Sequence, residues 1–534
     1  MGIMNFAIRP QSSWGSVTWV LIPAAAVLVP LAVGVSAGWL PTVLGRSTLL
    51  LALALSAVAA CSLIRRQSPL PGEGDRGWNW LWVSIGLAVA GVGIDRWLAA
   101  EINAVDFTVF FDRPIQRLAT IGELAVEEAD SPSFSWRSQF AVHGFWILIP
   151  VSWLYHLMES PLWLHALTGL CVAMGAFHLA RAAHHLGAGP ALAVATGIAL
   201  AGHDSTARAV NYGFHPELFY LWAIAWMLDA GLAGRRLTFA CAVLMAVSVK
   251  EDAFMPVTAA AIGLALHRWR AMSWSDRAWF LAAPVLIGGL SLIAFQKLAM
   301  RHYLGSETAT YAWMWSHWGP TQLQAVLGML VAPHRVLAEV YTSGIWKVLT
   351  PTLILPLLGW RWCIGIVPVL VLYALSACEP MRTFTVYYGA MAVPFLVLAS
   401  AAGIIGIANC WPDRASALRN AGAMLLVGSC LIGGGYMLRP IRSETTELAK
   451  VLARLDGPTT VHLQGALLPH AGYDRRFQLL NRRTMQGDGI VVIAPGLNPY
   501  PLQREELLRL VQNSTVVAAS PSGRVVVFRL EGGG

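Results

Sequence analysis

Long apolar runs separated by short polar turns make up most of the chain up to about residue 437. A helix that crosses the hydrocarbon core of a bilayer needs about 20 predominantly apolar residues, and most of these runs approach that length. The pair 237–250 and 253–267 is shorter, which predicts a tilted or partly re-entrant hairpin. Together the runs predict about thirteen membrane-spanning helices, at 17–36, 47–64, 78–94, 162–180, 189–203, 218–233, 237–250, 253–267, 279–297, 344–360, 362–378, 385–408 and 418–437.

Basic residues in the turns indicate the orientation, because Lys and Arg concentrate in the cytoplasmic loops of membrane proteins. Arg65 and Arg66 follow the second predicted span, so we expect a cytoplasmic N-terminus and an outer loop at 95–139. The apolar stretch 140–158 has two interpretations. If it crosses the membrane, later basic turns such as Arg235–Arg236 fall outside; if it lies on the outer surface or re-enters, they fall inside. We adopt the second interpretation.

The pattern changes near residue 440, where short alternating segments replace the long apolar runs. Segments 461–464, 490–494, 516–520 and 525–530 are predicted strands, and 444–455 and 501–512 are predicted helices. The fold class is therefore an all-α polytopic membrane protein with a small C-terminal α/β extramembrane domain. Its predicted parts are N-terminal transmembrane helices (1–94), an outer loop with surface or re-entrant helices (95–161), a transmembrane helical core (162–437) and an α/β outer domain (440–534).

Composition agrees with a membrane protein and excludes several other classes. Hydrophobic residues make up 56% of the 534 residues, charged residues make up 12%, and the mean hydropathy is +0.57. Much of the excess positive charge lies beside apolar runs, where it sets orientation, so the net charge of +8 predicts no nucleic-acid partner. The phosphate-binding motif GxxxxGK[ST] and the zinc-protease motif HExxH do not occur in the sequence.

Candidate chemistry stands at the ends of the apolar runs rather than in their middles. Charge beside hydrocarbon is costly unless it faces water, a partner or a ligand, so we expect these ends to form one outward-facing polar site. Each residue also has a structural interpretation: His215 and Glu217 flank a helix-starting Pro216, and Lys250 can extend its ammonium to the interface. The candidates are Asp106, His143, Asp204, Arg208, His215, Glu217, Lys250, Glu251 and Asp252.

Several of these residues lie in motifs that resemble a known family. The motifs DFTVFF (106–111), FHPELF (214–219) and VKEDAF (249–254) resemble the membrane family called domain of unknown function 2079 (DUF2079). The stretches 140–155, 387–403 and 467–480 carry the same resemblance, which covers the chain from about residue 100 onward. One departure is clear. The family often has a His before the Tyr that opens the late span, whereas Val386 and Tyr387 occupy that region here.

That family is in turn similar to the type C (GT-C) glycosyltransferase fold, whose members use a polyprenyl-phosphate sugar donor. The resemblance implies that Asp106 is the acid of the first large outer loop, which accepts a proton from the acceptor hydroxyl. It also implies that Lys250 offsets charge on the lipid phosphate. The predicted catalytic residues are Asp106, Glu217 and Lys250, and the predicted substrate-binding residues are Arg208, His215, His143, Glu251 and Asp252.

Partners and alternatives follow from the same resemblance. The acidic residues would orient the cations or hold a divalent metal ion, since oxygen ligands suit hard cations. The implied partners are the lipid bilayer, a polyprenyl-phosphate-linked sugar and a glycan, lipid or protein acceptor, with the protein in the plasma (inner) membrane. Two other functions stay open: a transporter, which usually shows internal repeats and midplane charges, and a non-catalytic membrane scaffold that presents the C-terminal domain.

Overall fold

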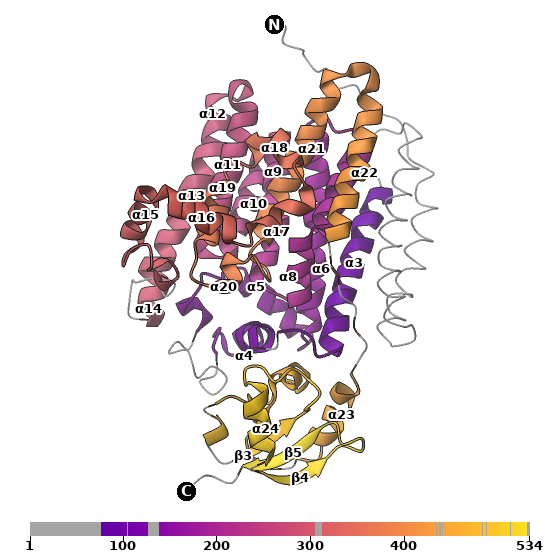
Figure 1. The fold of residues 1–534 in the computed structure, drawn as a ribbon, viewed down its shortest axis with the longest axis vertical. Coiled ribbons are helices and arrows are strands. Elements are labelled where there is room, and N and C mark those ends of the chain that lie inside the picture. The colour runs from indigo at the N-terminus through magenta and orange to yellow at the C-terminus, as the bar shows by residue number, and fades with distance from the viewer. Residues whose placement is uncertain are drawn as a thin grey trace.

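The computed structural model describes residues 76–103, 105–126, 138–304, 312–433, 435–436, 439, 442–455, 457–482, 484–486, 489–512 and 514–530. It consists of a large helical body with a small sheet-containing domain at one end (Figure 1). This agrees with the predicted mostly helical architecture and its small C-terminal α/β unit. The predicted spans 17–36 and 47–64 lie outside the described residues.

The centre of the helical body is built on α6 (Leu162–His185), which packs against its neighbours through glycines. A Cβ added at Gly169 would come within 2.2 Å of the carbonyl oxygen of Gly86, and one added at Gly175 within 2.7 Å of that of Leu221. Small residues let apolar helices approach closely where lipid provides no hydrophobic driving force. The helices packed on α6 include α3 (Arg76–Leu98), α7 (Pro190–Gly202), α9 (Phe219–Ala233) and α21 (Val393–Cys410), and α22 (Ala415–Gly433) packs on α7 and α21.

A second group of helices lies at the edge of the body. α12 (Trp274–Arg277) and α13 (Ala283–Ala294) join through π-helical turns into one helix, Trp274–Met300. Its apolar side chains remain largely exposed, Leu286 and Leu290 at 64% each, as expected of a surface that faces lipid. α10 (Arg236–Val249) and α11 (Phe254–Arg268) pack between this helix and α9.

Among the described residues, four helices are long and apolar enough to cross a membrane: Leu81–Leu98, Leu162–His185, Trp274–Met300 and Ala390–Cys410. A fifth is obtained if α15 (Gln322–Val331) and α16 (Pro333–Thr342), which are bent by 96° at their junction, count as one span. The predicted number of about thirteen crossings therefore stays a prediction.

The predicted spans 344–360 and 362–378 differ from the structure, since neither is a continuous helix. Prolines and glycines divide the region, and Leu353 adopts a positive φ of 55°. Non-helical backbone at membrane depth is tolerated where protein covers it, and here it packs on α21: a Cβ at Gly359 would lie 2.0 Å from the carbonyl oxygen of Ala399. The helices are α17 (Ile345–Leu349), α18 (Leu355–Leu358), α19 (Val367–Ala374) and α20 (Glu379–Arg382).

The predicted outer loop begins with a helix that is partly buried rather than lying wholly on the surface. A π-helical segment, η1 (Val105–Asp112), continues into α4 (Arg113–Ile121). Phe107 and Phe111 of η1 pack into the helical body, whereas Val105 and Val109 pack against the C-terminal domain.

The apolar stretch 140–158 is not one continuous helix. It consists of a 3-10 turn (Gln139–Ala141), α5 (Leu148–Ser152) and a second 3-10 turn (Trp153–His156). Such broken structure accords with the interpretation in which this stretch lies at the surface or re-enters, and that interpretation stays a prediction.

The helical body has two chemically different ends. Arg236, at the start of α10, donates to Asp276 of α12 (Nη2–Oδ1 2.9 Å) at the end opposite the C-terminal domain (Figure 1). Arg268 bonds the carbonyl oxygens of Gly231 and Leu232 there as well. The first residues of α9 and the last residues of α10 lie at the other end of these helices, about 20 Å from the basic turns, since each helix has roughly 14 residues at 1.5 Å rise.

The C-terminal domain contains one five-stranded mixed sheet in the order β2-β1-β3-β5-β4. β1 pairs in parallel with β2 and β3, whereas β5 is antiparallel to β3 and β4. The four predicted strands are present, and β2 is an additional strand that the sequence did not predict. The elements are α23 (Ser443–Leu452), β1 (Val461–Leu463), β2 (Phe477–Leu479), β3 (Gly489–Ile493), α24 (Arg504–Gln512), β4 (Thr515–Ala519) and β5 (Val526–Leu530).

Candidate functional site

Glu217 lies at the centre of a buried ionic cluster formed where helices begin and end. Its Oε1 accepts from the Lys250 ammonium at 3.0 Å, and its Oε2 pairs with Nδ1 of His215. The three residues are only 3%, 6% and 5% exposed. Pro216 starts the 3-10 turn before α9, and His215 and Lys250 have extended backbone, so these side chains leave the helical pattern and meet.

A second carboxylate, Asp252, lies on the other side of Lys250. Its Oδ2 is 4.0 Å from the Lys250 nitrogen. The hydroxyls of Tyr220 and Tyr373 donate to its two oxygens at 2.7 and 3.0 Å. The ammonium therefore lies between two carboxylates.

The third acid, Glu251, binds the broken stretch 140–158. Its Oε1 is 2.7 Å from Nδ1 of His143, and its Oε2 accepts from the backbone N–H of Gly144 at 3.0 Å. The sequence placed His143 in the same site as the VKEDAF turn, and the structure brings the two together. The pair ties the turn between α10 and α11 to the segment in front of α5.

Asp106 belongs to the same region through a set of tyrosines. The Tyr212 hydroxyl donates to Oδ2 of Asp106 and accepts from the Asn103 amide at 2.6 Å. Tyr387 stacks on His215, with ring centroids 3.5 Å apart, and its ring lies 5.7 Å from that of Tyr212. The Oδ1 atom of Asp106 takes no hydrogen bond from a described residue, so one carboxylate oxygen is held and the other is available.

The loop before Tyr387 has an unusual backbone. Phe384 and Val386 have φ values of 49° and 56°, a left-handed conformation that is rare for residues with a Cβ and especially for β-branched ones. Such strain persists only where the surroundings impose it, and it is concentrated at functional sites. Here it directs Tyr387 onto His215, in the region where the sequence departs from the family pattern.

The electrostatics of the cluster differ between its acids. Burial raises the pKa of Asp106, which the hydrogen bond from Tyr212 only partly offsets. Burial alone would also raise the pKa of Glu217, but His215 and Lys250 outweigh it and hold the pKa below its usual range. The two neighbouring cations therefore favour the charged form of Glu217, whereas burial favours the protonated form of Asp106.

One predicted substrate-binding residue, Arg208, stands apart from this arrangement. Arg208 pairs with Asp204 one helical turn earlier on α8 (Asp204–Tyr212), at 2.5 Å, and makes no described contact with the Glu217–Lys250 pair. In the described structure Asp204 is the partner of Arg208, and the assignment of Arg208 as a helper of Lys250 stays a prediction. Within the described residues, no group of three or more His, Cys, Asp or Glu is arranged to hold a metal ion.

The residues of this cluster lie within a match to a known protein family. Residues 106–431 match the model of the family described as "Predicted membrane protein (DUF2079)". The chain belongs to this family. The match begins at Asp106 and includes His215, Glu217, Lys250 and Tyr387.

Comparison with solved structures finds a similarity to ArnT from Cupriavidus metallidurans in the apo state. The TM-score is 0.44, the identity is 12%, and the match covers 85% of this chain and 98% of that one. A likeness of this size carries no inference about activity. No curated protein matches the chain.

The DUF2079 protein thus brings most of its predicted site residues into one connected region, and adds tyrosines that the sequence reasoning missed. Two of these tyrosines have a recognisable signal in the sequence, since Tyr212 lies two residues before Phe214, where the FHPE motif begins, and Tyr387 opens the stretch 387–403. Tyr220 and Tyr373 lie within apolar runs, and the sequence contains no signal that marks them as site residues. The residues brought together are Asp106, His143, His215, Glu217, Lys250, Glu251 and Asp252, with Tyr212, Tyr220, Tyr373 and Tyr387 added.

Proposed function

We propose that this protein is a glycosyltransferase that moves a sugar from a polyprenyl-phosphate donor to an acceptor hydroxyl at the outer face of the plasma membrane. The observation that carries the proposal is Asp106, a carboxylate with one oxygen held by Tyr212 and the other available. It is connected to the Glu217–Lys250 pair through the rings of Tyr212, Tyr387 and His215. Transfer from a lipid phosphate needs a base for the acceptor proton and a cation for the departing phosphate. The cluster has both.

In this mechanism Asp106 Oδ1 accepts the proton of the acceptor hydroxyl while the oxygen of that hydroxyl bonds to the anomeric carbon of the sugar. The bond between that carbon and the phosphate oxygen breaks, and the lipid phosphate leaves with the electron pair. Lys250 offsets the charge that develops on the phosphate, while Glu217 holds the ammonium in position. The raised pKa of Asp106 makes it a better base than an ordinary exposed Asp.

The location of the cluster supports the outer face. The basic turns with Arg236 and Arg268 lie at the opposite end of α9 and α10, and such turns face the cytoplasm in most membrane proteins. The C-terminal domain would then be extracytoplasmic, beside the cluster, where it can cover or bind an acceptor.

The test measures consumption of labelled polyprenyl-phosphate sugars by purified protein in liposomes, with membrane extract as the source of acceptor. Asp106→Asn should lower turnover by about 10²–10⁴-fold, the usual contribution of a general base, and leave donor binding intact. Lys250→Ala should weaken donor binding as well. The matched control is Asp276→Asn, which removes a carboxylate at the opposite end and should leave turnover unchanged.

One outcome would contradict the assignment directly. If Asp106→Asn turns over the donor at the wild-type rate while Glu217→Gln and Lys250→Ala are inactive, the base is a different residue. If no polyprenyl-phosphate sugar binds the wild-type protein more tightly than it binds the Lys250→Ala variant, the donor class is wrong.

A further inference from the structure

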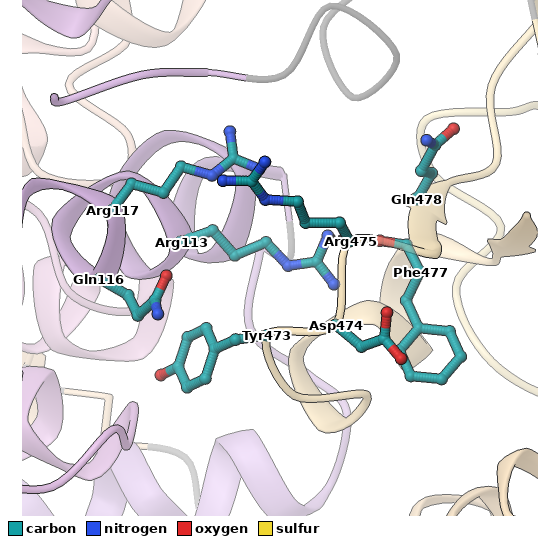
Figure 2. Close-up of a pocket in the computed structure, with 8 residues that line it drawn as sticks. All are labelled: Arg113, Gln116, Arg117, Tyr473, Asp474, Arg475, Phe477 and Gln478. Atoms are coloured by element: carbon teal, nitrogen blue, oxygen red, sulfur yellow. Dashed lines mark hydrogen bonds between the residues drawn. The ribbon is translucent and has the colours of Figure 1, made fainter. Parts of the chain in front are cut away.

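A second basic site lies outside the cluster, between α4 and the C-terminal domain. A pocket there is lined by Arg113, Gln116 and Arg117 of α4 and by the segment 473–478, including Arg475. In Figure 2 the side chains of Arg117 and Arg475 extend toward each other from opposite sides, and Arg113 lies between α4 and that segment. Three guanidinium groups from two separate parts of the chain thus border one cavity.

The cavity is a built site rather than a chance gathering of surface charge. Arg113 is 7% exposed and donates to the carbonyl oxygens of Phe477 (2.6 Å) and Gly472 (3.2 Å), so its guanidinium group is fixed between α4 and the C-terminal domain. Arg117 follows one helical turn later and therefore projects from the same face of α4. The opposite face is anchored by Ile115, which is fully buried in the helical body.

The lining carries three arginines and one aspartate, and Glu159 is bonded to the lining residue Gln116 at 3.0 Å. Asp474 is the one acid in the lining, and its carboxylate already pairs with Arg476 outside the lining, at 2.8 Å from Nη2. Arg475 makes no hydrogen bond or ion pair with a described residue. Three cations against one committed anion repel one another, and an anion between them would relieve that repulsion.

We propose that this pocket binds a phosphate group. Guanidinium groups match the oxygens of phosphate by forming two parallel hydrogen bonds each, and several of them converging on one cavity suit a doubly charged anion better than a carboxylate. The phosphate could belong to a lipid headgroup, because α4 lies where the helical body ends (Figure 1), or to a soluble compound. The site is separate from the Glu217–Lys250 cluster and does not depend on the proposed transferase activity.

The experiment measures equilibrium binding of two probes to the full-length protein in neutral detergent, by calorimetry. Dioctanoyl phosphatidic acid represents a lipid phosphate, with dioctanoylglycerol as the phosphate-free control, and inorganic phosphate represents a soluble source. Arg475→Gln and Arg117→Gln should each weaken phosphatidic acid binding about tenfold, the loss of one charge-assisted contact. Arg504→Gln, an exposed Arg of the same domain that makes no described contact, should bind as the wild type does.

The two probes distinguish the sources. Binding of inorganic phosphate that also displaces the lipid supports a soluble phosphate ligand, whereas binding of phosphatidic acid alone supports a headgroup. The proposal is overturned if neither probe binds, if dioctanoylglycerol binds as tightly as phosphatidic acid, or if Arg504→Gln weakens binding as much as Arg475→Gln. Because Arg475 is exposed and holds no described contact, its variant should fold, so unchanged binding would also overturn the site.

Discussion

Removing one partner of the buried Glu217–Lys250 pair should destabilise the protein far more than removing one partner of an exposed pair of the same length. The two side chains are 4% and 8% exposed and 3.0 Å apart. Glu217→Gln keeps the shape of the side chain but leaves the Lys250 ammonium buried with a single carboxylate, Asp252, at 4.0 Å. The variant therefore tests the charge and not the packing.

The expected magnitude follows from distance and burial. At 3.0 Å the attraction is about 5–6 kcal/mol for an effective dielectric constant near 20, before the cost of desolvation. Breaking a buried pair by removing one partner typically costs about 3–5 kcal/mol, because the remaining charge is left uncompensated. Since Asp252 still offsets part of the Lys250 charge, we expect about 3 kcal/mol for Glu217→Gln.

The assay is a double-mutant cycle of Glu217→Gln and Lys250→Met, followed by equilibrium unfolding in mixed micelles. The pair should show a coupling energy of about 2 kcal/mol or more. The matched control is the Arg335–Glu339 pair, whose closest atoms are also 3.0 Å apart but whose side chains are 48% and 29% exposed. An exposed pair of this spacing should couple by about 0.5 kcal/mol or less.

Two results would refute the reasoning. Equal coupling in the two cycles would mean that burial does not set the strength of the pair. Additive effects of Glu217→Gln and Lys250→Met would mean that the two charges do not meet in the folded protein. Either result would also remove the ionic centre from the candidate site.

Three other predictions concern pH, packing and orientation. Burial raises the pKa of Asp112 to about 6 despite hydrogen bonds from two tyrosines, so the folded protein holds this proton more tightly than the unfolded chain does. The free energy of unfolding should therefore fall by about 3 kcal/mol as the pH rises from about 4 to above 6. In thermal unfolding, Asp112→Asn should lack this pH dependence. Gly169→Ala should destabilise the protein in denaturant titrations, because its Cβ would meet the carbonyl oxygen of Gly86 at 2.2 Å, whereas Gly406→Ala, with open space around it, should be neutral or stabilising by up to about 1 kcal/mol. A Cys at the exposed position 504 of the C-terminal domain should react with an impermeant thiol reagent from outside the cell, and a Cys at the exposed position 235 should not; the reverse labelling would invert the proposed orientation.

The convergence of the charged residues could be predicted from the sequence for a simple energetic reason. Charge at the end of an apolar helix must find a partner or water, and the motifs FHPE and KED are placed at the ends of consecutive helices. Those ends must meet if α9 and α10 run in opposite directions across the body. Glu217 and Lys250 lie 3.0 Å apart accordingly.

Other features could not be predicted because they depend on contacts distant in sequence. Tyr373 lies in an apolar run and appears as a span residue until α19 brings its hydroxyl to Asp252. Arg208 appears available in the sequence, but the acid one turn earlier binds it. The breaks within 344–378 arise from prolines and glycines whose effect depends on packing against α21, where Gly359 allows close approach.

One continuous helical segment connects the two candidate sites. Asp106, near the start of η1, belongs to the ionic cluster, and Arg113, seven residues later, borders the basic pocket, roughly 10 Å along the helix axis. Between them Asp112 accepts from the hydroxyls of Tyr155 and Tyr473, at 2.6 and 2.8 Å, so it joins the broken membrane stretch to the C-terminal domain. The broken stretch 140–158 and the C-terminal domain are therefore both fixed to the helix that carries the proposed base, through the one carboxylate of Asp112.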